Sequence, residues 1–219
     1  EDDDIEAIFA REFSRFVDTR QNTTLADLDY DGATFSAILE TEGQTSKLQV
    51  DRVLFATGRL PNSELLNLGA TGLATDSRGF IPVNDELETA VPGIFAAGDI
   101  NGRHMLQHAA SFEIHYLRQK LLKHAVGPIS DAQIGHAVYA HPEVASVGLT
   151  EHQLVEQGIP YVSVFQDWQN SARAMAKLAD YARIKLLVSP EDYAILGCHL
   201  VGPEADTIIH QVLAVMQVK

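Results

Sequence analysis

The sequence predicts a mixed fold in which α/β and α+β parts follow one another along the chain. Two short apolar runs, residues 53–56 and 94–97, are followed by a glycine within two residues, as buried strands of an α/β sheet often are. Residues 4–17 and 105–124 carry apolar side chains at helical spacing. From residue 137 onward, strand-like and helix-like runs are mixed. A chain of 219 residues, 46% of them hydrophobic, is long enough for one or two domains with buried cores.

The first 58 residues predict one helix followed by strands. The acidic start of residues 4–17 complements the positive N-terminal end of a helix. Asp31-Gly32 is a typical hairpin turn, and Glu42-Gly43 marks a second turn. Val53-Leu54-Phe55-Ala56 resembles a buried strand, because it is continuous and apolar. The expected strands are residues 25–30, 34–39, 47–50 and 53–56.

Residues 59–136 predict short elements and then one long helix. Pro61 favours the entry to a short helix over residues 62–67. A long helix is expected from Met105 to His124, since its apolar side chains are spaced for burial on one face. The Gly-Pro-rich residues 127–136 suggest a linker between domains. Short strands are expected at residues 80–83 and 94–97.

The last segment, residues 137–219, predicts an α+β domain. Thr150 is placed to cap a helix from Glu151 to Gln157, which Gly158 ends. Residues 204–218 predict an apolar helix with no stop signal. Strands are expected in the stretch that holds Tyr139, Val144 and Val147, and at residues 161–165, 182–187 and 195–201.

Charge and composition disfavour several classes of partner. The net charge of −14 argues against nucleic acid, because phosphate binding needs clustered Lys and Arg, and against docking onto an anionic membrane surface. No apolar run reaches the length that spans a bilayer. The acidic start at residues 1–4 is unlike a signal peptide, so we expect a cytoplasmic protein. Since the sequence has no initiator Met, we expect it to start within a longer protein.

Cys198 is the single cysteine of the sequence. The chain therefore has no internal disulfide and no paired-cysteine metal motif, and no metal site is predicted. Because Cys198 lies beside Gly197 in an apolar run, we expect a small buried residue rather than a catalytic thiol. The low cysteine count fits a cytoplasmic protein.

The most informative stretch for chemistry runs from Gly93 to Ile100. An apolar strand is expected to stop at Gly98, which allows a ligand to approach the backbone closely. Asp99 follows, and its carboxylate can accept hydrogen bonds from sugar-like hydroxyls. The helix expected from Met105 points its free N–H groups and positive end toward the same place, where an electron-rich or anionic group is stabilised. Ligands bind at this edge of open α/β sheets.

Three segments in order give this stretch its specificity. They are Ala56-Thr57-Gly58-Arg59-Leu60-Pro61-Asn62, then Thr89-Ala90-Val91-Pro92-Gly93-Ile94-Phe95-Ala96-Ala97-Gly98-Asp99, then the helix that opens near Met105. In this order they resemble the class I pyridine nucleotide-disulfide oxidoreductases, and the resemblance covers essentially the whole chain. This family includes dihydrolipoyl dehydrogenases, glutathione and mycothione reductases, and mercuric reductases. The resemblance implies FAD, with NAD or NADP, as cofactors.

The resemblance also implies roles for particular residues. Asp99 would bind the ribityl chain of FAD, with Gly98 making room, and Gly58 matches the glycine near the NAD(P) site. The backbone of the helix-opening segment would lie along the pyrimidine edge of the flavin, so the imidazole of its histidine need not do proton chemistry. Gln107 is a mild departure, since the family more often has Ala there. That segment consists of Met105, Leu106, Gln107 and His108.

The second half resembles the interface domain of the same family. Val138–Glu151, with its Tyr-x-His-Pro-Glu-Val-Ala motif, is more similar to dihydrolipoyl dehydrogenases than to mercuric reductases, where we expect an acidic residue in place of His141. Asn170-Ser171 with Arg173-Ala174 is also similar, although Ala172 interrupts the spacing. The resemblance implies a homodimer through residues 133–219. His141-Pro142-Glu143 is equally consistent with a surface turn.

The implied domains are the end of an NAD(P)-binding domain at 1–58, a returning FAD-domain segment at 59–132 and a truncated dimerisation domain at 133–219. The chain has no G-x-G-x-x-G, no Cys-x4-Cys and no later His-Pro and Glu segment. We therefore expect a C-terminal fragment that is inactive alone, from an enzyme that interconverts dihydrolipoamide and lipoamide with NAD, acting on a small dithiol or a lipoyl-bearing protein. An NADPH-dependent glutathione-type, mycothione-type or mercuric reductase, and a non-catalytic dimerisation module, remain alternatives.

Overall fold

The computed structural model describes residues 1–122, 127–129, 134–168 and 170–218. Within them the chain divides into two compact units. One unit is the contiguous segment Ser14–Arg59. The other combines Glu1–Phe13 with Leu60–Lys219, so it is built from two separate stretches of sequence.

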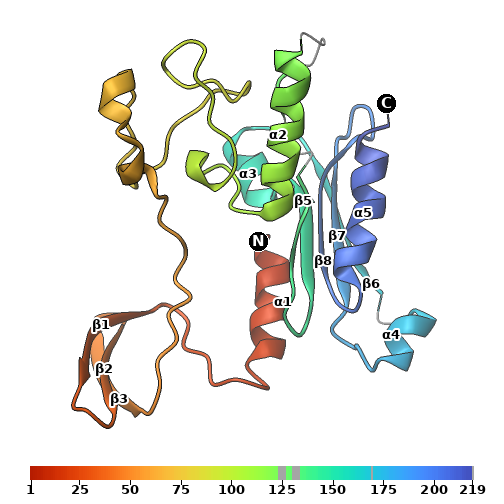
Figure 1. Cartoon of the computed structure of the whole chain (residues 1–219). Coiled ribbons are helices and arrows are strands. Elements are labelled where there is room, and N and C mark those ends of the chain that lie inside the picture. The colour runs from red at the N-terminus through yellow and green to blue at the C-terminus, as the bar shows by residue number, and fades with distance from the viewer. Residues whose placement is uncertain (123–126, 130–133, 169, 219) are drawn as a thin grey trace. The chain divides into compact units, whose positions relative to one another are not determined.

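The unit Ser14–Arg59 contains an antiparallel sheet of three strands in the order β1-β2-β3 (Figure 1). The Asp31 carboxylate accepts hydrogen bonds from the N–H groups of Ala33 and Thr34, both at 2.8 Å, and so closes the first turn. The hairpin that Asp31-Gly32 predicted is confirmed. The strands are β1 (Thr23–Tyr30), β2 (Phe35–Thr41) and β3 (Gln44–Val50).

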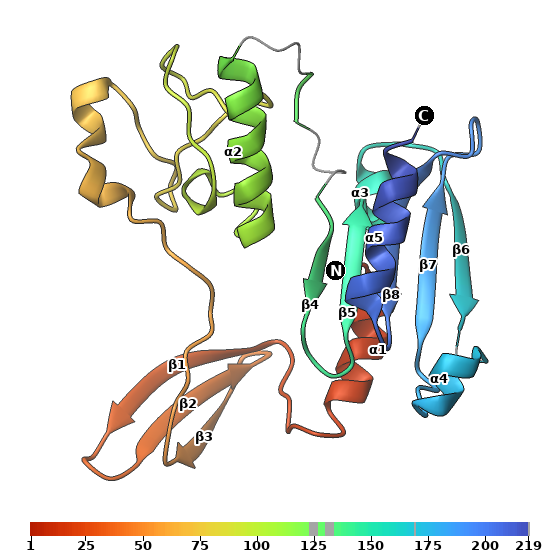
Figure 2. The ribbon, with the colours of Figure 1, turned by 45° about the vertical axis from the view of Figure 1, so that its right-hand side comes forward.

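The larger unit contains an antiparallel five-stranded sheet in the order β4-β5-β8-β7-β6. Figure 2 shows the strands side by side, with β4 at one edge and β6 at the other. The central strands β5 and β8 are paired with each other although β6 and β7 lie between them in sequence. The strands are β4 (His136–Val138), β5 (Val144–Gly148), β6 (Val162–Asp167), β7 (Arg183–Val188) and β8 (Ile195–Val201).

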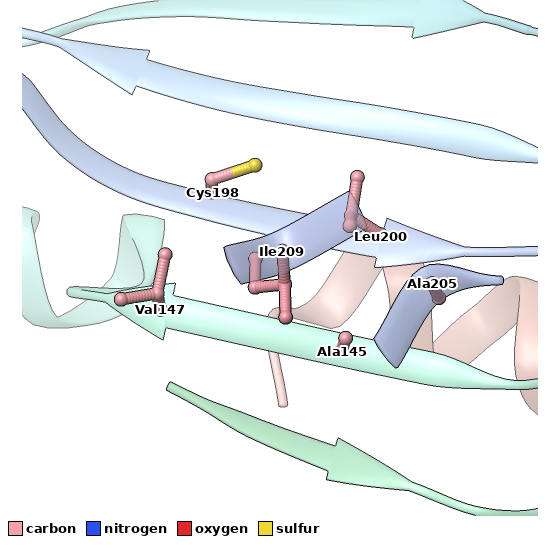
Figure 3. Packing of buried hydrophobic residues seen from close by; sticks show 6 residues of the cluster. All are labelled: Ala145, Val147, Cys198, Leu200, Ala205 and Ile209. Carbon is pink, nitrogen blue, oxygen red and sulfur yellow. The ribbon is translucent and has the colours of Figure 1, made fainter. Parts of the chain in front are cut away.

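The two faces of this sheet are covered by different helices, because alternate side chains of a strand point to opposite faces. On one face, α5 (Ala205–Met216) buries the cluster shown in Figure 3, which includes Ala145, Val147, Cys198 and Leu200. On the other, α1 (Asp3–Phe13) packs Ile5 against Val144 and Val201. The central strands β5 and β8 are therefore buried between two helices, whereas β6 is exposed.

The remaining helices are short except one. The helix α2 (Gln107–Leu121) carries the buried residues Ala109, Tyr116 and Leu117. The side chain of Thr150 caps α3 (Glu151–Glu156) in a capping box with Gln153. Single 3-10 turns cover Ser63–Leu66, Leu68–Thr71 and Asp99–Asn101, and α4 spans Ala172–Ala176.

Most predicted elements are present with boundaries shifted by a few residues. The helix predicted over 4–17 ends at Phe13, and the one predicted from Met105 begins at Gln107. The end predicted at His124 lies outside the described residues, as do residues 130–133 of the predicted linker. That linker was predicted to reach 136, but His136 already belongs to β4. The helix α4 was not predicted.

Three predicted strands are wrong. Residues 53–56 form no strand, and Leu54 and Phe55 are 91% and 63% exposed, since the described residues offer this run no strand to pair with. Residues 80–83 form no strand. Residues 94–97 form only one bridge, Glu88 to Phe95. An apolar run becomes a strand only when a neighbouring backbone takes up its hydrogen bonds.

Candidate functional site

The turn at Gly98 and Asp99 is built around a backbone conformation that favours glycine. Gly98 is buried, with φ 79° and ψ −162°, and a Cβ there would lie 3.4 Å from the Cβ of Ala110. The Asp99–Asn101 turn follows directly and ends at Gly102, whose N–H donates to the Asp99 carbonyl at 3.2 Å. Asp99 is exposed. The backbone therefore presents this carboxylate on a tight turn.

Backbone hydrogen bonds hold the turn from both sides. Before it, Thr89 N–H donates to Ile94 O at 2.9 Å, and Ala96 N–H donates to Leu87 O at 3.1 Å. After it, Ile81 N–H donates to Ile100 O at 2.9 Å. The predicted strand ending at Gly98 is thus replaced by a short hairpin-like connection, which fixes Asp99 without a parallel sheet among the described residues.

The start of α2 exposes backbone donors. Leu106 is the N-cap residue, in extended conformation, and no side chain caps the helix there. The first N–H groups of a helix have no partner within it, so this end offers donors and a positive dipole. Met105 and Leu106 are half-buried, whereas Gln107 and His108 are exposed. The structure thus has an uncapped helix start eight residues after Asp99.

The side chains of Gln107 and His108 are engaged locally. Gln107 Nε2 donates to the Ser111 hydroxyl at 3.1 Å, one turn along the helix. His108 Nε2 lies 2.7 Å from the carbonyl oxygen of Gly135. This bond ties the start of α2 to the segment that leads into β4. It favours a role in position and packing for the imidazole.

Gly58 belongs to the other unit, Ser14–Arg59. It is exposed, has φ 106°, and follows the exposed run at residues 53–56. The remaining predicted site residues, Gly98 to His108, all lie in the larger unit. The larger unit therefore holds both the Gly98 turn and the start of α2, whereas Gly58 lies in the other unit.

Sequence reasoning missed Glu113, which lies in α2 and is 1% exposed. Its Oε2 accepts a hydrogen bond from Gly98 N–H at 2.6 Å and another from Asn101 Nδ2 at 2.9 Å. A signal was present: Glu113 stands four residues from Ala109 and from Leu117, so an acidic residue lies on the apolar face of a helix. A buried carboxylate needs donors, and the Gly98 turn provides them.

A second missed group joins α1 to the sheet, and we call it the Lys185 cluster: Lys185, Asp2, Asp4 and Glu151. Lys185 is 2% and Asp2 1% exposed. Lys185 Nζ lies 2.8 Å from Asp2 Oδ1 and 2.6 Å from Asp4 Oδ2, and also contacts the Glu151 carboxylate. Burial alone would lower the pKa of Lys185, but its three carboxylate partners raise that pKa above its usual value.

Glu1 extends this ionic region to β4 and β5. Its Oε1 lies 2.7 Å from His136 Nε2, and its other carboxylate oxygen accepts from the Ser146 hydroxyl. Burial would raise the pKa of Glu1, but the hydrogen bonds from His136 and Ser146 lower it to about 2. These contacts fasten the first residues to the sheet and lie in the part of the chain that the resemblance assigns to dimerisation.

Cys198 is fully buried in the α5 side of the sheet (Figure 3). Burial raises the pKa of its thiol to about 12, so the thiolate is not available near neutral pH. The prediction of a structural cysteine is confirmed.

A large surface hollow lies elsewhere. It has a volume of about 860 Å³ and is lined by residues 60–64, 73–75 and their neighbours. None of the predicted site residues lines it. In the described ranges, moreover, no helix is both long and apolar enough to cross a membrane.

Two family models match the chain. The model described as "Pyridine nucleotide-disulphide oxidoreductase" matches residues 1–113, and "Pyridine nucleotide-disulphide oxidoreductase, dimerisation domain" matches residues 134–219. Together they cover the Gly98 turn, the start of α2 and the five-stranded sheet.

Over the aligned residues, curated relatives are about a third identical to the chain. A soluble pyridine nucleotide transhydrogenase from Vibrio atlanticus (strain LGP32) is 36% identical over 173 residues, which are 79% of this chain and 37% of that protein. A dihydrolipoyl dehydrogenase from Mycoplasma pneumoniae is 34% identical over 175 residues, 80% of this chain and 38% of that protein. The chain thus spans well under half the length of these relatives.

Solved structures agree on the fold. LpdA from Mycobacterium tuberculosis matches 99% of this chain and 47% of its own length, with a TM-score of 0.87 and 23% identity. The HOCl-induced flavoprotein disulfide reductase RclA from Escherichia coli matches 99% of this chain and 49% of its own, with a TM-score of 0.79 and 25% identity. The family's members are enzymes that depend on FAD and NAD(P). The chain belongs to the class I pyridine nucleotide-disulfide oxidoreductases.

Proposed function

We propose that this chain supplies part of the FAD pocket and the dimerisation domain of a flavin-dependent dithiol/disulfide oxidoreductase of the dihydrolipoyl dehydrogenase type. The reaction would be dihydrolipoamide + NAD⁺ = lipoamide + NADH + H⁺. The observation that carries the proposal is the Asp99 carboxylate on the Gly98 turn, eight residues before the uncapped start of α2. The relationship to a dihydrolipoyl dehydrogenase supports the choice of substrate.

The residues present fit a flavin dinucleotide. Gly98 has a φ of 79°, which favours glycine, and Asp99 can accept hydrogen bonds from ribityl hydroxyls. The backbone donors around Met105, Leu106, Gln107 and His108 suit the electron-rich pyrimidine edge of the ring. Gly58 leaves room for close approach of NAD(P). The flavin, when bound, supplies the exchange of hydride with nicotinamide and of electrons with a disulfide.

We further propose the domain limits 1–58 for the NAD(P)-binding part, 59–132 for the FAD-domain segment and 133–219 for the dimerisation domain. The last would form a homodimer in the cytoplasm, and the partner substrate would be a small dithiol or a lipoyl-bearing protein. With one cysteine, this chain has no redox pair of its own. The piece alone would therefore not reduce disulfides.

A second function is favoured by one specific observation. Relatives 36 to 38% identical to the chain are soluble pyridine nucleotide transhydrogenases. The alternative is thus hydride exchange between two pyridine nucleotides through the same flavin. A disulfide reductase of another specificity is the third candidate, supported by the structural likeness to RclA.

Assays on the full-length protein separate these functions. Turnover of dihydrolipoamide with NAD, and none between NADPH and an NAD analogue, would support the main proposal. Turnover between the two nucleotides without any dithiol would support the alternative. Reduction of a disulfide such as glutathione disulfide by NADPH would favour the third.

The flavin site itself is tested by Asp99→Ala in the full-length protein. Loss of hydrogen bonds to a charged group should weaken FAD binding roughly ten- to hundredfold. Flavin content after exhaustive dialysis, with fluorescence titration of the apoprotein, measures the change. Asp192→Ala is the control, because Asp192 is an exposed aspartate that accepts from Ala194 N–H in the β7–β8 turn. Flavin content equal to that of the control would contradict the assignment.

A further inference from the structure

The turn that carries Asp99 is tethered from inside by one side chain. Glu113 reaches from the second turn of α2 to Gly98, the residue before Asp99, and to Asn101, the last residue of the Asp99–Asn101 turn. A single oxygen, Oε2, accepts both bonds, at 2.6 and 2.9 Å. The carboxylate therefore holds the backbone N–H before Asp99 and the Asn101 side chain after it.

The donors that Glu113 holds are themselves buried. Asn101 is 6% exposed, and its Oδ1 accepts from Arg103 N–H at 2.9 Å, so its side chain spans the interior of the turn. Asn101 N–H donates to the Gly98 carbonyl at 3.0 Å. Without Glu113, the Gly98 amide and the Asn101 amide group would both lose their closest acceptor in a buried place, which is costly.

The environment of the other oxygen of Glu113 indicates that this side chain does more than fill space in the core. Within the described residues, its Oε1 is buried and has no hydrogen-bond partner. An apolar residue would fill the same face of α2 without that cost. A charged acceptor is retained where its remaining oxygen holds a turn in one conformation.

We propose that Glu113 is a positioning residue for flavin binding, which acts by holding the Gly98–Asn101 turn so that the Asp99 carboxylate meets the ribityl hydroxyls. The inference rests on the proposed function of Asp99. It assigns to Glu113 no contact with the flavin and no proton transfer. Its effect on affinity therefore depends on Asp99 being present.

The test is a double-mutant cycle on FAD affinity in the full-length apoprotein. Glu113→Gln keeps the side-chain volume and one acceptor oxygen for Gly98 and Asn101, but it removes the charge that strengthens both hydrogen bonds, so the FAD dissociation constant should rise about fivefold or more. In Asp99→Ala, adding Glu113→Gln should cause no further loss, because the two residues act through one interaction. Additive losses, or an unchanged affinity in Glu113→Gln, would overturn the inference.

Glu12→Gln is the matched control, since Glu12 is also buried, at 3% exposure, but lies in α1. It should leave FAD affinity unchanged. The melting temperature of each apoprotein, measured in parallel, distinguishes a positioning role from a general loss of stability. The Glu113→Gln and Glu12→Gln variants should have similar melting temperatures, but only Glu113→Gln should bind FAD more weakly. If Glu113→Gln does not fold, Asn101→Ala loosens the same tether from its other end and should give the same non-additive pattern.

The outcomes also separate this inference from the proposed function. If Asp99→Ala retains FAD, the assignment of Asp99 fails and the inference fails with it. If Asp99→Ala loses FAD while Glu113→Gln and Asn101→Ala retain it, only the positioning role of Glu113 is refuted.

Discussion

At the residue scale, two buried charged side chains, Glu113 and Lys185, hold separate parts of the chain together. Glu113 and Lys185 are each nearly inaccessible, and each binds groups that are far away in sequence. Burying a charge is expensive unless partners offset the lost hydration. Lys185 has three carboxylate partners, whereas Glu113 has amide donors on one oxygen. The two residues thus fasten different parts of the larger unit.

The Lys185 cluster makes a quantitative prediction. Lys185→Met should lower the free energy of unfolding by about 3–5 kcal/mol, because it leaves the Asp2 carboxylate buried among other carboxylates without its cation. Urea unfolding followed by circular dichroism measures the change. Lys177→Met is the control: Lys177 pairs with Glu204 at an exposed site, and its loss should cost no more than about 1 kcal/mol. Similar losses in both variants would show that the cluster is no stronger than a surface pair.

The residues of the candidate site differ in how far sequence predicts them. Gly98 and Asp99 were predictable, since a glycine-acid pair after an apolar run is a local signal that accompanying motifs make specific. Glu113 and Lys185 were not predicted, because a charge on the apolar face of a helix or within an apolar strand does not show which distant groups it binds. Their roles arise only when α2 folds over the Gly98 turn and when α1 packs on the sheet.

At the element scale, the end of β5 is a close approach between two strands. Gly148 has φ 79°, and a Cβ there would lie 2.3 Å from the Leu196 carbonyl oxygen and 2.9 Å from the Gly197 Cα. That same carbonyl accepts from Leu149 N–H at 2.9 Å. The glycine therefore lets β5 stay paired with β8 as the chain turns toward α3.

Gly148→Ala should accordingly destabilise the protein more than an alanine at a glycine with a similar φ and open space. Gly158 is that control: its φ is 66°, and in the described part of the chain no atom lies within 4 Å of the place that a Cβ would take. Both variants share the cost of a left-handed alanine, and the clash should add about 1–3 kcal/mol at Gly148 alone. Thermal or urea unfolding of the two variants gives the difference. Equal losses of stability would mean that β8 can move away from the added Cβ without a loss of free energy.

Elements specified by local signals were predicted well. The β1–β2 hairpin follows from Asp31-Gly32, and α3 from the Thr150 cap and Gly158. The strand predicted at residues 53–56 failed because hydrophobicity alone does not provide a pairing partner. The helix α4 was missed because five residues are too few for a periodic pattern, although Ser171 caps it through Ala174 N–H at 3.2 Å.

At the scale of the whole molecule, the chain joins a cofactor-binding part to a dimerisation domain. If the protein is a homodimer, its melting temperature depends on concentration, because association stabilises the folded state by mass action. Raising the concentration of the full-length protein about a hundredfold should raise the melting temperature by a few degrees. Differential scanning fluorimetry measures the shift, and light scattering gives the mass. A constant melting temperature with a monomeric mass at every concentration would refute the dimer.

The contact between Asp2 and Lys185 joins residues 183 positions apart. At a synthesis rate of about 5–20 residues per second, α1 leaves the ribosome roughly 10–40 s before β7 and β8 have followed it. During that interval Ile5 cannot complete its packing, since Val144 in β5 follows only later and Val201 in β8 comes last. A nascent chain of this kind is a candidate for chaperone protection, and the acidic residues of α1 would help to keep it dispersed until the sheet arrives.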